Sequence, residues 1–329
     1  SIGWVDEGGA LRVGPRSAGS VPGPAVYGRG GEELTVTDAN VLVGHIPSDL
    51  VLGGSVALDV AAGRRAAGAL AERSGLSPDR VVAGVLEVVD AHMERALRAV
   101  SVEEGVDPRQ SALVAFGGAG GLHASRLARR LGIREVLIPP LSGVFSALGL
   151  LLATPRADAA RTVMLGEGDD RLTASLESVS RSAGERFEAM FGQRPVAVTM
   201  TLDMRYVGQS HEIEVDASGS WPSVSRGFHV AHRERFGFDR LDAATEVVNV
   251  RAVASGRPPI TWGDLPEASP SVAPSGGNGV WHRETLPPGF EVTGPAVVVE
   301  DNSATLLEHG DRLTVLADGT LEIRLDTSG

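Results

Sequence analysis

A loop of four glycines and one alanine between two apolar segments constrains this chain more than any other feature. Residues 111–116 (SALVAF) form a short apolar run suited to a buried strand, and residues 117–121 (GGAGG) follow it directly. A helix is expected over residues 122–131, and residues 135–138 (EVLI) are expected to form the next strand. Strand, glycine loop, helix and strand make a βαβ unit, so this half of the chain is predicted to be α/β.

Two helices are expected upstream of this unit. Residues 55–74 carry apolar or small side chains at helical spacing, and Gly75 is a typical C-terminal stop. In the second helix, Ser77 is suited to the N-cap and Pro78 to the first helical position. Apolar residues then keep a period of 3.6 as far as position 100, which predicts a long helix.

Beyond about residue 165 the pattern becomes β-rich, which predicts two domains, residues 1–165 and 166–329, the second of α+β type. A Pro/Gly/Ser-rich linker is expected near residues 256–279. The expected elements of the second domain are a helix over 171–191, a short helix over 227–236, alternating strands at 196–206 and 246–254, further strands at 296–300 and 305–308, and a hairpin across 317–319. His229 and His232 are expected on a solvated helix face.

The composition excludes several classes of function. The chain contains no cysteine and no lysine, so all 30 of its basic groups are arginines, and any bound phosphate has to be held by backbone amides, arginine or a metal. With 42 acidic groups the formal charge is −12, which makes a nucleic-acid partner an unfavourable expectation. The sequence also shows no apolar stretch long enough to span a membrane and no secretory signal, so a cytoplasmic protein is expected.

The glycine loop is a candidate phosphate-binding site. The backbone amides of Gly117, Gly118, Ala119, Gly120 and Gly121 can approach a ligand closely, and the following helix N-terminus favours anions. The dinucleotide-binding pattern is not matched, because a histidine stands where its third glycine is required. A tight turn with close helix–sheet packing is an equally good interpretation.

Two polar residues are candidates for chemistry, each beside a simpler structural interpretation. His123 lies in the first turn of the expected helix, where the helix dipole favours a neutral ring that can accept a proton or ligate a metal. Without further context, a structural role with a hydrogen bond to a neighbouring loop is the favoured interpretation. Asp38, in the segment TVTDAN (residues 35–40), is suited to Mg²⁺ bound to nucleotide phosphates, but it can also cap a turn together with Asn40.

Several segments, taken together and in this order, resemble the hydantoinase/oxoprolinase A-subunit family. The matching segments are SIGWVDEGGALRVGPRSAG (1–19), PGP (22–24), TVTDAN (35–40), DPR (107–109), AFGGAG (115–120), LHA (122–124), SALG (146–149), DMRYVGQ (203–209), GPA (294–296) and Glu300. The resemblance covers essentially the whole chain. It departs from the family pattern at Gly121, Val26 and Val106, where proline, cysteine and histidine are usual.

The resemblance implies the second lobe of an actin/Hsp70/sugar-kinase-like ATPase fold, followed by a β-rich α+β domain. It implies that the glycine loop contacts ATP. It also implies that Asp38 and His123 are polar contacts to phosphate, to Mg²⁺ (at Asp38) or to the activated substrate. Family members are about twice this long, so an upstream half and a B-type subunit are the expected partners.

The implied activity is that of the ATP-dependent subunit of a hydrolase that opens cyclic amides of the 5-oxoproline or hydantoin type. ATP would phosphorylate the amide oxygen. One alternative is the β subunit of an ATP-dependent acetone or acetophenone carboxylase. Another is an inactive docking fragment that lacks the phosphate-loop half.

Overall fold

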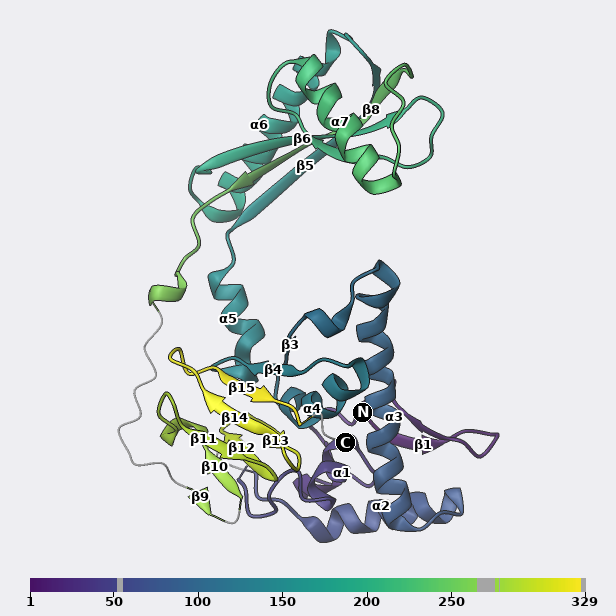
Figure 1. The fold of residues 1–329 in the computed structure, drawn as a ribbon, viewed down its shortest axis with the longest axis vertical. Helices are drawn as coiled ribbons and strands as arrows, with labels where there is room; N and C mark the ends of the chain where they lie inside the picture. The colour runs from purple at the N-terminus through teal and green to yellow at the C-terminus, as the bar shows by residue number, and fades with distance from the viewer. Residues whose placement is uncertain (52–55, 265–275, 278, 327–329) are drawn as a thin grey trace. The chain divides into compact units, whose positions relative to one another are not determined.

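A computed structural model describes residues 1–51, 56–264, 276–277 and 279–326 of the 329-residue chain. The chain divides into two compact units (Figure 1). The first unit contains residues 1–148 together with the described residues from 276 on, and the second contains residues 149–264. Both units combine helices with β-sheet, which confirms the expected α/β class.

The first unit contains the helices α1–α4, the start of α5, and three β-sheets. The helices are α1 (Val36–Leu42), α2 (Val60–Ser74), α3 (Pro78–Ala99), α4 (Gly120–Leu131) and α5 (Phe145–Leu152). The strands are β1 (Gly3–Val5), β2 (Leu11–Val13), β3 (Leu113–Val114), β4 (Glu135–Ile138), β9 (Gly276–Gly277), β10 (Val280–His282), β11 (Glu291–Thr293), β12 (Ala296–Glu300), β13 (Ser303–Leu307), β14 (Arg312–Val315) and β15 (Leu321–Arg324).

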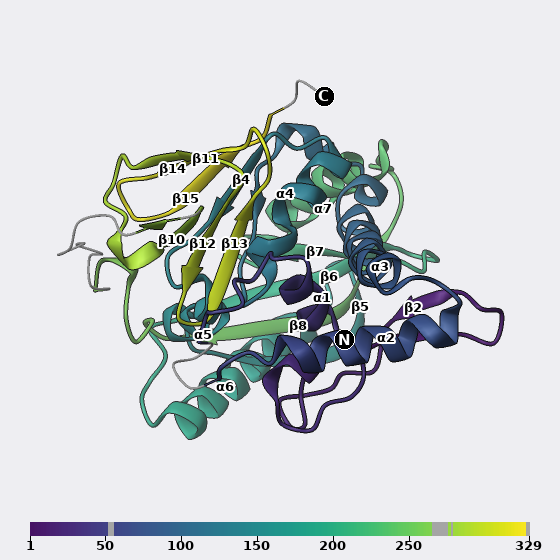
Figure 2. The same cartoon turned by 90° about the horizontal axis from the view of Figure 1, so that it is seen from below.

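The predicted βαβ unit is present. Strands β3 and β4 are parallel, with Leu113 opposite Val136, and α4 connects them. Helix α4 ends at Gly132, whose φ of 72° suits glycine. Ala124, Ala128 and other apolar residues of α4 share one core with strands of both larger sheets, and on its other side α4 lies beside α3 (Figure 2).

C-terminal strands complete the five-stranded sheet that contains β3 and β4. β15 pairs with β4, with Leu321 opposite Ile138, so the strand order is β11-β14-β15-β4-β3. Division at residue 165 places β10–β15 with the second domain, whereas the structure places them in the first unit. The difference arises because β15 pairs with β4, which is far from it in the sequence. Local periodicity does not indicate which distant strands pair.

The second unit is a four-stranded sheet, of order β5-β8-β6-β7, packed against α6 and α7. Its elements are β5 (Arg156–Gly166), α6 (Arg171–Phe191), β6 (Ala197–Tyr206), β7 (Ile213–Asp216), α7 (Trp221–Phe236) and β8 (Thr245–Ser255). Phe187, Tyr206 and Phe228 are fully buried in its core. About half of the expected linker near 256–279 lies outside the described residues.

His232 corrects one expectation from the sequence. It was predicted to lie on a solvated helix face, but it is 1% exposed. Its Nδ1 lies 2.8 Å from the carbonyl oxygen of Phe238, to which it donates. The ring of His232 also contacts Tyr206 edge to face and lies at a tilt against Phe236. The aromatic residues around it therefore account for its burial.

The upstream helices show how capping sets their bounds. Helix α3 starts at Pro78 after Ser77, whose hydroxyl accepts a hydrogen bond from the Arg80 amide. Helix α2 starts at Val60, later than expected, because Asp59 caps it by accepting a hydrogen bond from the Ala62 amide at 2.9 Å. Within the described part of the chain, no helix is both long enough and apolar enough to cross a membrane.

Candidate functional site

The glycine loop lies at the carboxyl end of β3, where α4 begins. Gly117 has a φ of 87°, and its N–H donates a 2.7 Å hydrogen bond to the carbonyl of Ser142, in the loop that follows β4. Because β3 and β4 are parallel, the two loops meet at one edge of the sheet. That edge is where ligands bind in open α/β sheets.

One side of the loop is open. Gly118 and Ala119 are exposed, and within the described residues their N–H groups have no acceptor. A side chain at Gly117 would meet nothing within 4 Å. Two free amides at the N-terminus of a helix are suited to phosphate oxygens. At Gly118 and Ala119 the loop therefore offers two exposed N–H donors of this kind.

The other side of the loop is closed by packing. A Cβ at Gly121 would lie 2.5 Å from Thr305 Oγ1 and 2.8 Å from the carbonyl oxygen of Ala304, both on β13. A Cβ at Gly118 would lie 3.0 Å from the carbonyl oxygen of Asn302. The packing at Gly121 therefore supports the interpretation as a tight turn between α4 and β13, while phosphate binding at the free amides of Gly118 and Ala119 stays a prediction.

The neighbouring positions 120 and 121 are expected to respond differently to alanine. Gly121→Ala forces its methyl group into β13 and is expected to lower the free energy of unfolding by about 2–3 kcal/mol. At Gly120 the nearest atom to a Cβ is 3.8 Å away, so Gly120→Ala is expected to stay within about 0.5 kcal/mol of the parent. Urea unfolding of both variants tests this. Equal losses at the two positions would contradict the packing explanation.

His123 is buried against an aspartate that sequence reasoning missed. Its ring is 4% exposed, and its Nδ1 lies 2.6 Å from Oδ1 of Asp90 on α3, which is 2% exposed. Arg126 Nε donates to the other carboxylate oxygen of Asp90 at 2.7 Å. The imidazole N–H on Nδ1 therefore donates to Asp90, and Nε2 carries the lone pair. Asp90 follows Leu86 by four residues, which places it on the apolar face of α3. A polar residue on that face was the feature of the sequence that could have indicated a site.

The charge of Asp90 is maintained in spite of its burial. Burial alone would raise the pKa of this carboxyl, but the hydrogen bonds from His123 and Arg126 outweigh it and hold the pKa below its usual range. Asp90 is therefore an anion at neutral pH that faces one cation and one polarised imidazole. Asp90, His123 and Arg126, together with His45, which is described next, are called the histidine cluster below.

His45 is the fourth member of the histidine cluster, and it too was missed. It follows α1, and its Nδ1 donates to Oδ1 of Asn40 at 2.9 Å, while the amide of Asn40 donates to the carbonyl of Val36. Burial, followed by electrostatic interaction with Arg126 and then with His123, lowers the pKa of His45 to about 4, and Asp90 opposes this in part. His45 is therefore neutral at physiological pH.

The lowered pKa of His45 predicts acid sensitivity. The ordinary value is 6.5 and the folded value is about 4, so between these pH values the unfolded chain binds more protons than the folded one. Stability is then expected to fall as the pH drops from 6.5 to 4. His45→Gln removes this titration, so its Tm is expected to fall less than that of the parent between pH 7 and pH 5. Parallel Tm curves for the two proteins would contradict the assignment.

Asp38 is placed as a cap. It is fully buried, Oδ1 accepts the N–H of Val26 at 2.7 Å, and Oδ2 accepts both the N–H and the hydroxyl of Thr35 at 2.7 Å. Thr35 in turn caps α1 by accepting the Asp38 amide. Both oxygens of Asp38 are therefore used within the chain, and Asp38 does not fit a Mg²⁺ ligand. Across the described residues, no group of three or more His, Asp or Glu side chains is arranged to hold a metal.

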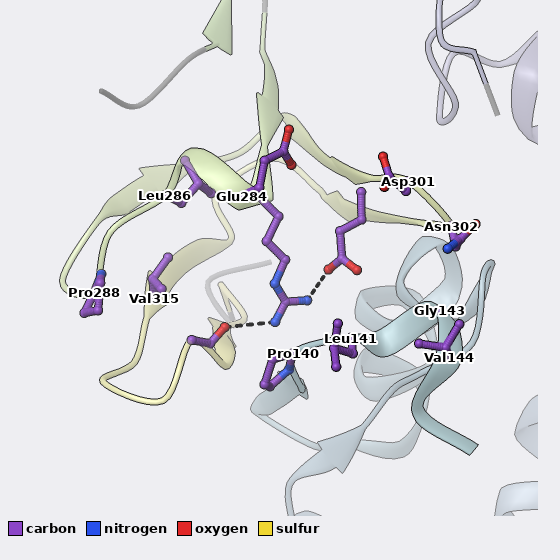
Figure 3. A pocket seen from close by; sticks show the side chains of 13 residues that line it. Pro140, Leu141, Gly143, Val144, Glu284, Leu286, Pro288, Asp301, Asn302 and Val315 are labelled. Atoms are coloured by element: carbon purple, nitrogen blue, oxygen red, sulfur yellow. Dashed lines mark hydrogen bonds and ion pairs between the residues drawn. The ribbon is translucent and has the colours of Figure 1, made fainter. Parts of the chain in front are cut away.

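A cavity of about 510 Å³ lies near this sheet edge, between the loop after β4 and the turn from β12 to β13 (Figure 3). Arg283 is 9% exposed there and pairs with Glu300. Its Nη2 also donates to the carbonyl oxygens of Ile138 and Gly319, at 3.0 and 2.9 Å. This cavity could not be predicted from the sequence, because its walls come from segments more than 100 residues apart.

The glycine-loop helix and the strands on both sides of it belong to a stretch that matches a known family model. Residues 1–159 match the model described as Hydantoinase/oxoprolinase. This stretch is a hydantoinase/oxoprolinase domain. The expected family is thereby confirmed, and the glycine loop, the histidine cluster and one wall of the cavity all belong to the hydantoinase/oxoprolinase domain.

Relatives of known activity extend the similarity past this domain. Caprolactamase subunit alpha of Pseudomonas jessenii is 32% identical over 98% of this chain, and 5-oxoprolinase 1 of Arabidopsis thaliana is 30% identical over 97% of it. The chain covers 51% of the first relative and 28% of the second, so it spans about half the length of the first and less of the second.

Two solved structures share the fold. The crystal structure of the ATP-dependent caprolactamase from Pseudomonas jessenii superposes with a TM-score of 0.72 over 98% of this chain and 51% of that one, at 32% identity. The nucleotide-free structure of acetone carboxylase superposes with a TM-score of 0.81 over the same shares, at 23% identity. At that lower identity the likeness concerns the fold alone. The ATPase-like fold expected for the hydantoinase/oxoprolinase domain is confirmed.

Proposed function

We propose that this chain is part of the ATP-dependent subunit of an enzyme that hydrolyses cyclic amides. The observation that carries the proposal is its similarity to caprolactamase subunit alpha, at 32% identity, which extends over 98% of the chain and is matched in three dimensions. The similarity to a 5-oxoprolinase supports the same class of reaction.

The free amides of the glycine loop support ATP as co-substrate. Gly118 and Ala119 offer two N–H donors to phosphate oxygens, and backbone amides are one of the three means, with arginine and a metal, by which a chain without lysine can hold phosphate. When bound, ATP supplies a phosphoryl group to the amide oxygen of the substrate, which removes the resonance that makes an amide unreactive. Among the described residues, no group of three or more His, Asp or Glu side chains is arranged to hold a metal, so no step is assigned to a metal on this chain.

His123 is proposed as the polar group of the site. It lies in the first turn of α4, just after the glycine loop, and Asp90 holds its proton on Nδ1 so that Nε2 is free to accept one. Asp38 is instead proposed to hold α1 in place, since it is fully buried and both of its oxygens accept hydrogen bonds from this chain. The remaining half of the longer relatives and a B-type subunit are the proposed partners.

The likeness in fold to acetone carboxylase supports a second candidate. In a carboxylase, ATP would activate a ketone and bicarbonate instead of an amide. The lower identity to that structure, 23% against 32% for caprolactamase, favours the amide hydrolase. The two candidates differ in which substrate stimulates the consumption of ATP.

Phosphate release from ATP tests the proposal. The chain is assembled with the remaining half and a B-type subunit, and release is measured with ε-caprolactam, hydantoin, 5-oxoproline, or acetone plus bicarbonate. Stimulation by a cyclic amide, lost in His123→Ala and kept in His92→Ala, is the expected result, since His92 is an exposed histidine on α3. Stimulation by acetone plus bicarbonate alone would favour the carboxylase. No stimulation in a folded assembly would contradict both activities and leave the docking fragment.

A further inference from the structure

We propose that the cavity of Figure 3 binds the ring of an uncharged cyclic amide and disfavours anionic ones. The inference rests on the proposed function and adds to it the place and the charge class of the substrate. Three features of the cavity lead to it: walls that are already in place, an apolar lining that includes one strained leucine, and a charge balance that is negative.

The walls are held in position without a ligand. A Cβ at Gly143 would lie 2.8 Å from the carbonyl oxygen of Asn302, so the loop after β4 lies directly against the β12–β13 turn. The hydroxyls of Ser142 and Ser303 are 2.9 Å apart and join the same two segments. Arg283 ties its own segment to the end of β4 through the carbonyl of Ile138. At about 510 Å³, the cavity is of the size that small molecules occupy in proteins.

The apolar lining includes a residue in an unfavourable conformation. Leu141 has a φ of 57°, in the left-handed region that glycine adopts at no cost, and its side chain lines the cavity while 53% exposed. Val144, Leu286 and Val315 supply further apolar surface. A strained backbone that presents an apolar side chain to an open cavity is typical of a ligand contact. The methylene groups of a lactam ring match this surface.

The charged residues that line the cavity are mostly acidic. Its arginine, Arg283, is already neutralised by Glu300 and by two carbonyl oxygens. Two further carboxylates, Glu284 and Asp301, line the cavity as well. The carboxylate of 5-oxoproline would therefore enter a negative site, whereas caprolactam and hydantoin carry no charge.

The polar groups match those of an amide. Asn302 lines the cavity, and its side-chain amide has no partner among the described residues, so its Nδ2 is available to donate to a substrate carbonyl. Carboxylate oxygens such as those of Asp301 are suited to accept the N–H of the ring. A neutral cyclic amide therefore finds a donor, an acceptor and apolar surface in one cavity.

Direct binding to the 329-residue chain tests the inference without activity. Saturation-transfer NMR titrations are made with ε-caprolactam, hydantoin and 5-oxoproline. We expect saturable binding of the two neutral rings and at least about threefold weaker binding of 5-oxoproline. The double variant Glu284→Gln/Asp301→Asn is expected to reduce that difference. Equal binding of all three, or no saturable binding of either neutral ring, would overturn the inference.

Leu141→Gly separates binding from folding. Glycine accepts the left-handed backbone, so the Tm is expected to stay the same or rise, while binding of ε-caprolactam weakens by about tenfold through lost apolar contact. Leu241→Gly, at an exposed leucine of the second unit, is the control and should leave binding unchanged. Unchanged binding in Leu141→Gly would contradict the inference.

The assembled enzyme distinguishes failure of this inference from failure of the proposed function. If a cyclic amide stimulates phosphate release but Leu141→Gly leaves its KM unchanged, the cavity is not the substrate site and the function stands. If Leu141→Gly prevents assembly with the remaining half or the B-type subunit, the cavity is a protein contact and the inference is wrong. If no amide stimulates release, the proposed function itself fails.

Discussion

Asp38→Ala is expected to lower the free energy of unfolding by about 3 kcal/mol. The substitution removes the acceptor for the buried amides of Val26 and Thr35 and breaks the reciprocal cap of α1. Each buried donor left without a partner costs about 1–3 kcal/mol, and loss of a helix cap costs about 1 kcal/mol. Urea unfolding followed by circular dichroism measures the change.

Two further variants identify the cause. Asp38→Asn keeps one oxygen, so it is expected to lose less stability than Asp38→Ala. Asp79→Ala removes an exposed acid in the first turn of α3 and is expected to change stability by no more than about 0.5 kcal/mol. If Asp38→Ala folded with unchanged stability while ATP turnover by the assembled enzyme were lost, Asp38 would belong to the active site after all.

Asp90→Ala is expected to cost about 2–4 kcal/mol of stability, because it removes the closer of the two carboxylates that pair with Arg126, beside a buried imidazole, and among the described residues leaves only Glu308 at 3.5 Å. Arg126 is 20% exposed, so water compensates in part, which keeps the expected loss below that of a fully buried pair. The same substitution frees the ring of His123. We therefore expect the ¹⁵N chemical shifts of that ring to show a mixture of tautomers in the variant and a single one in the parent.

The neighbouring acid on α3 supplies the control. Glu94 is four residues further along the helix and pairs with Arg98 at 2.9 Å near the surface, so Glu94→Ala is expected to cost less than about 1 kcal/mol. The double variant Asp90→Ala/Arg126→Met is expected to recover part of the loss, because it removes the charge that has lost its buried partner. A double variant no more stable than Asp90→Ala would show that packing, and not charge, explains the effect.

Local sequence patterns were enough to predict the helices and strands whose caps, turns and hydrophobic periodicity lie within the element itself. Helix α3 starts at Pro78 because its cap and its period lie in adjacent residues, and α6 spans 171–191 as expected for the same reason. The βαβ unit was predictable because glycines interrupt two apolar runs of different period. These signals require only residues within one or two turns of each other.

Contacts between residues far apart in the sequence could not be predicted from it. His123 and Asp90 are 33 positions apart, and nothing in the sequence states that α3 and α4 face each other there. The interpretation of Asp38 was left open for a related reason, because its second acceptor contact, to Val26, comes from outside its own helix. Even the residue types were ambiguous, since a capping aspartate and a metal-binding aspartate look the same in a sequence.

The pairing of β4 with β15 has a consequence for synthesis of the protein. Leu321 emerges from the ribosome about 180 residues after Ile138, which at about 5–20 residues per second is a delay of roughly 10–40 s. Throughout that time the hydantoinase/oxoprolinase domain is translated in full, yet one edge of β4 has no strand beside it. The second unit can fold during the same interval, because all its strands are contiguous in the chain. In newly made copies of this protein, the first unit therefore begins to emerge before the second unit, but its sheet is completed after the second unit has emerged.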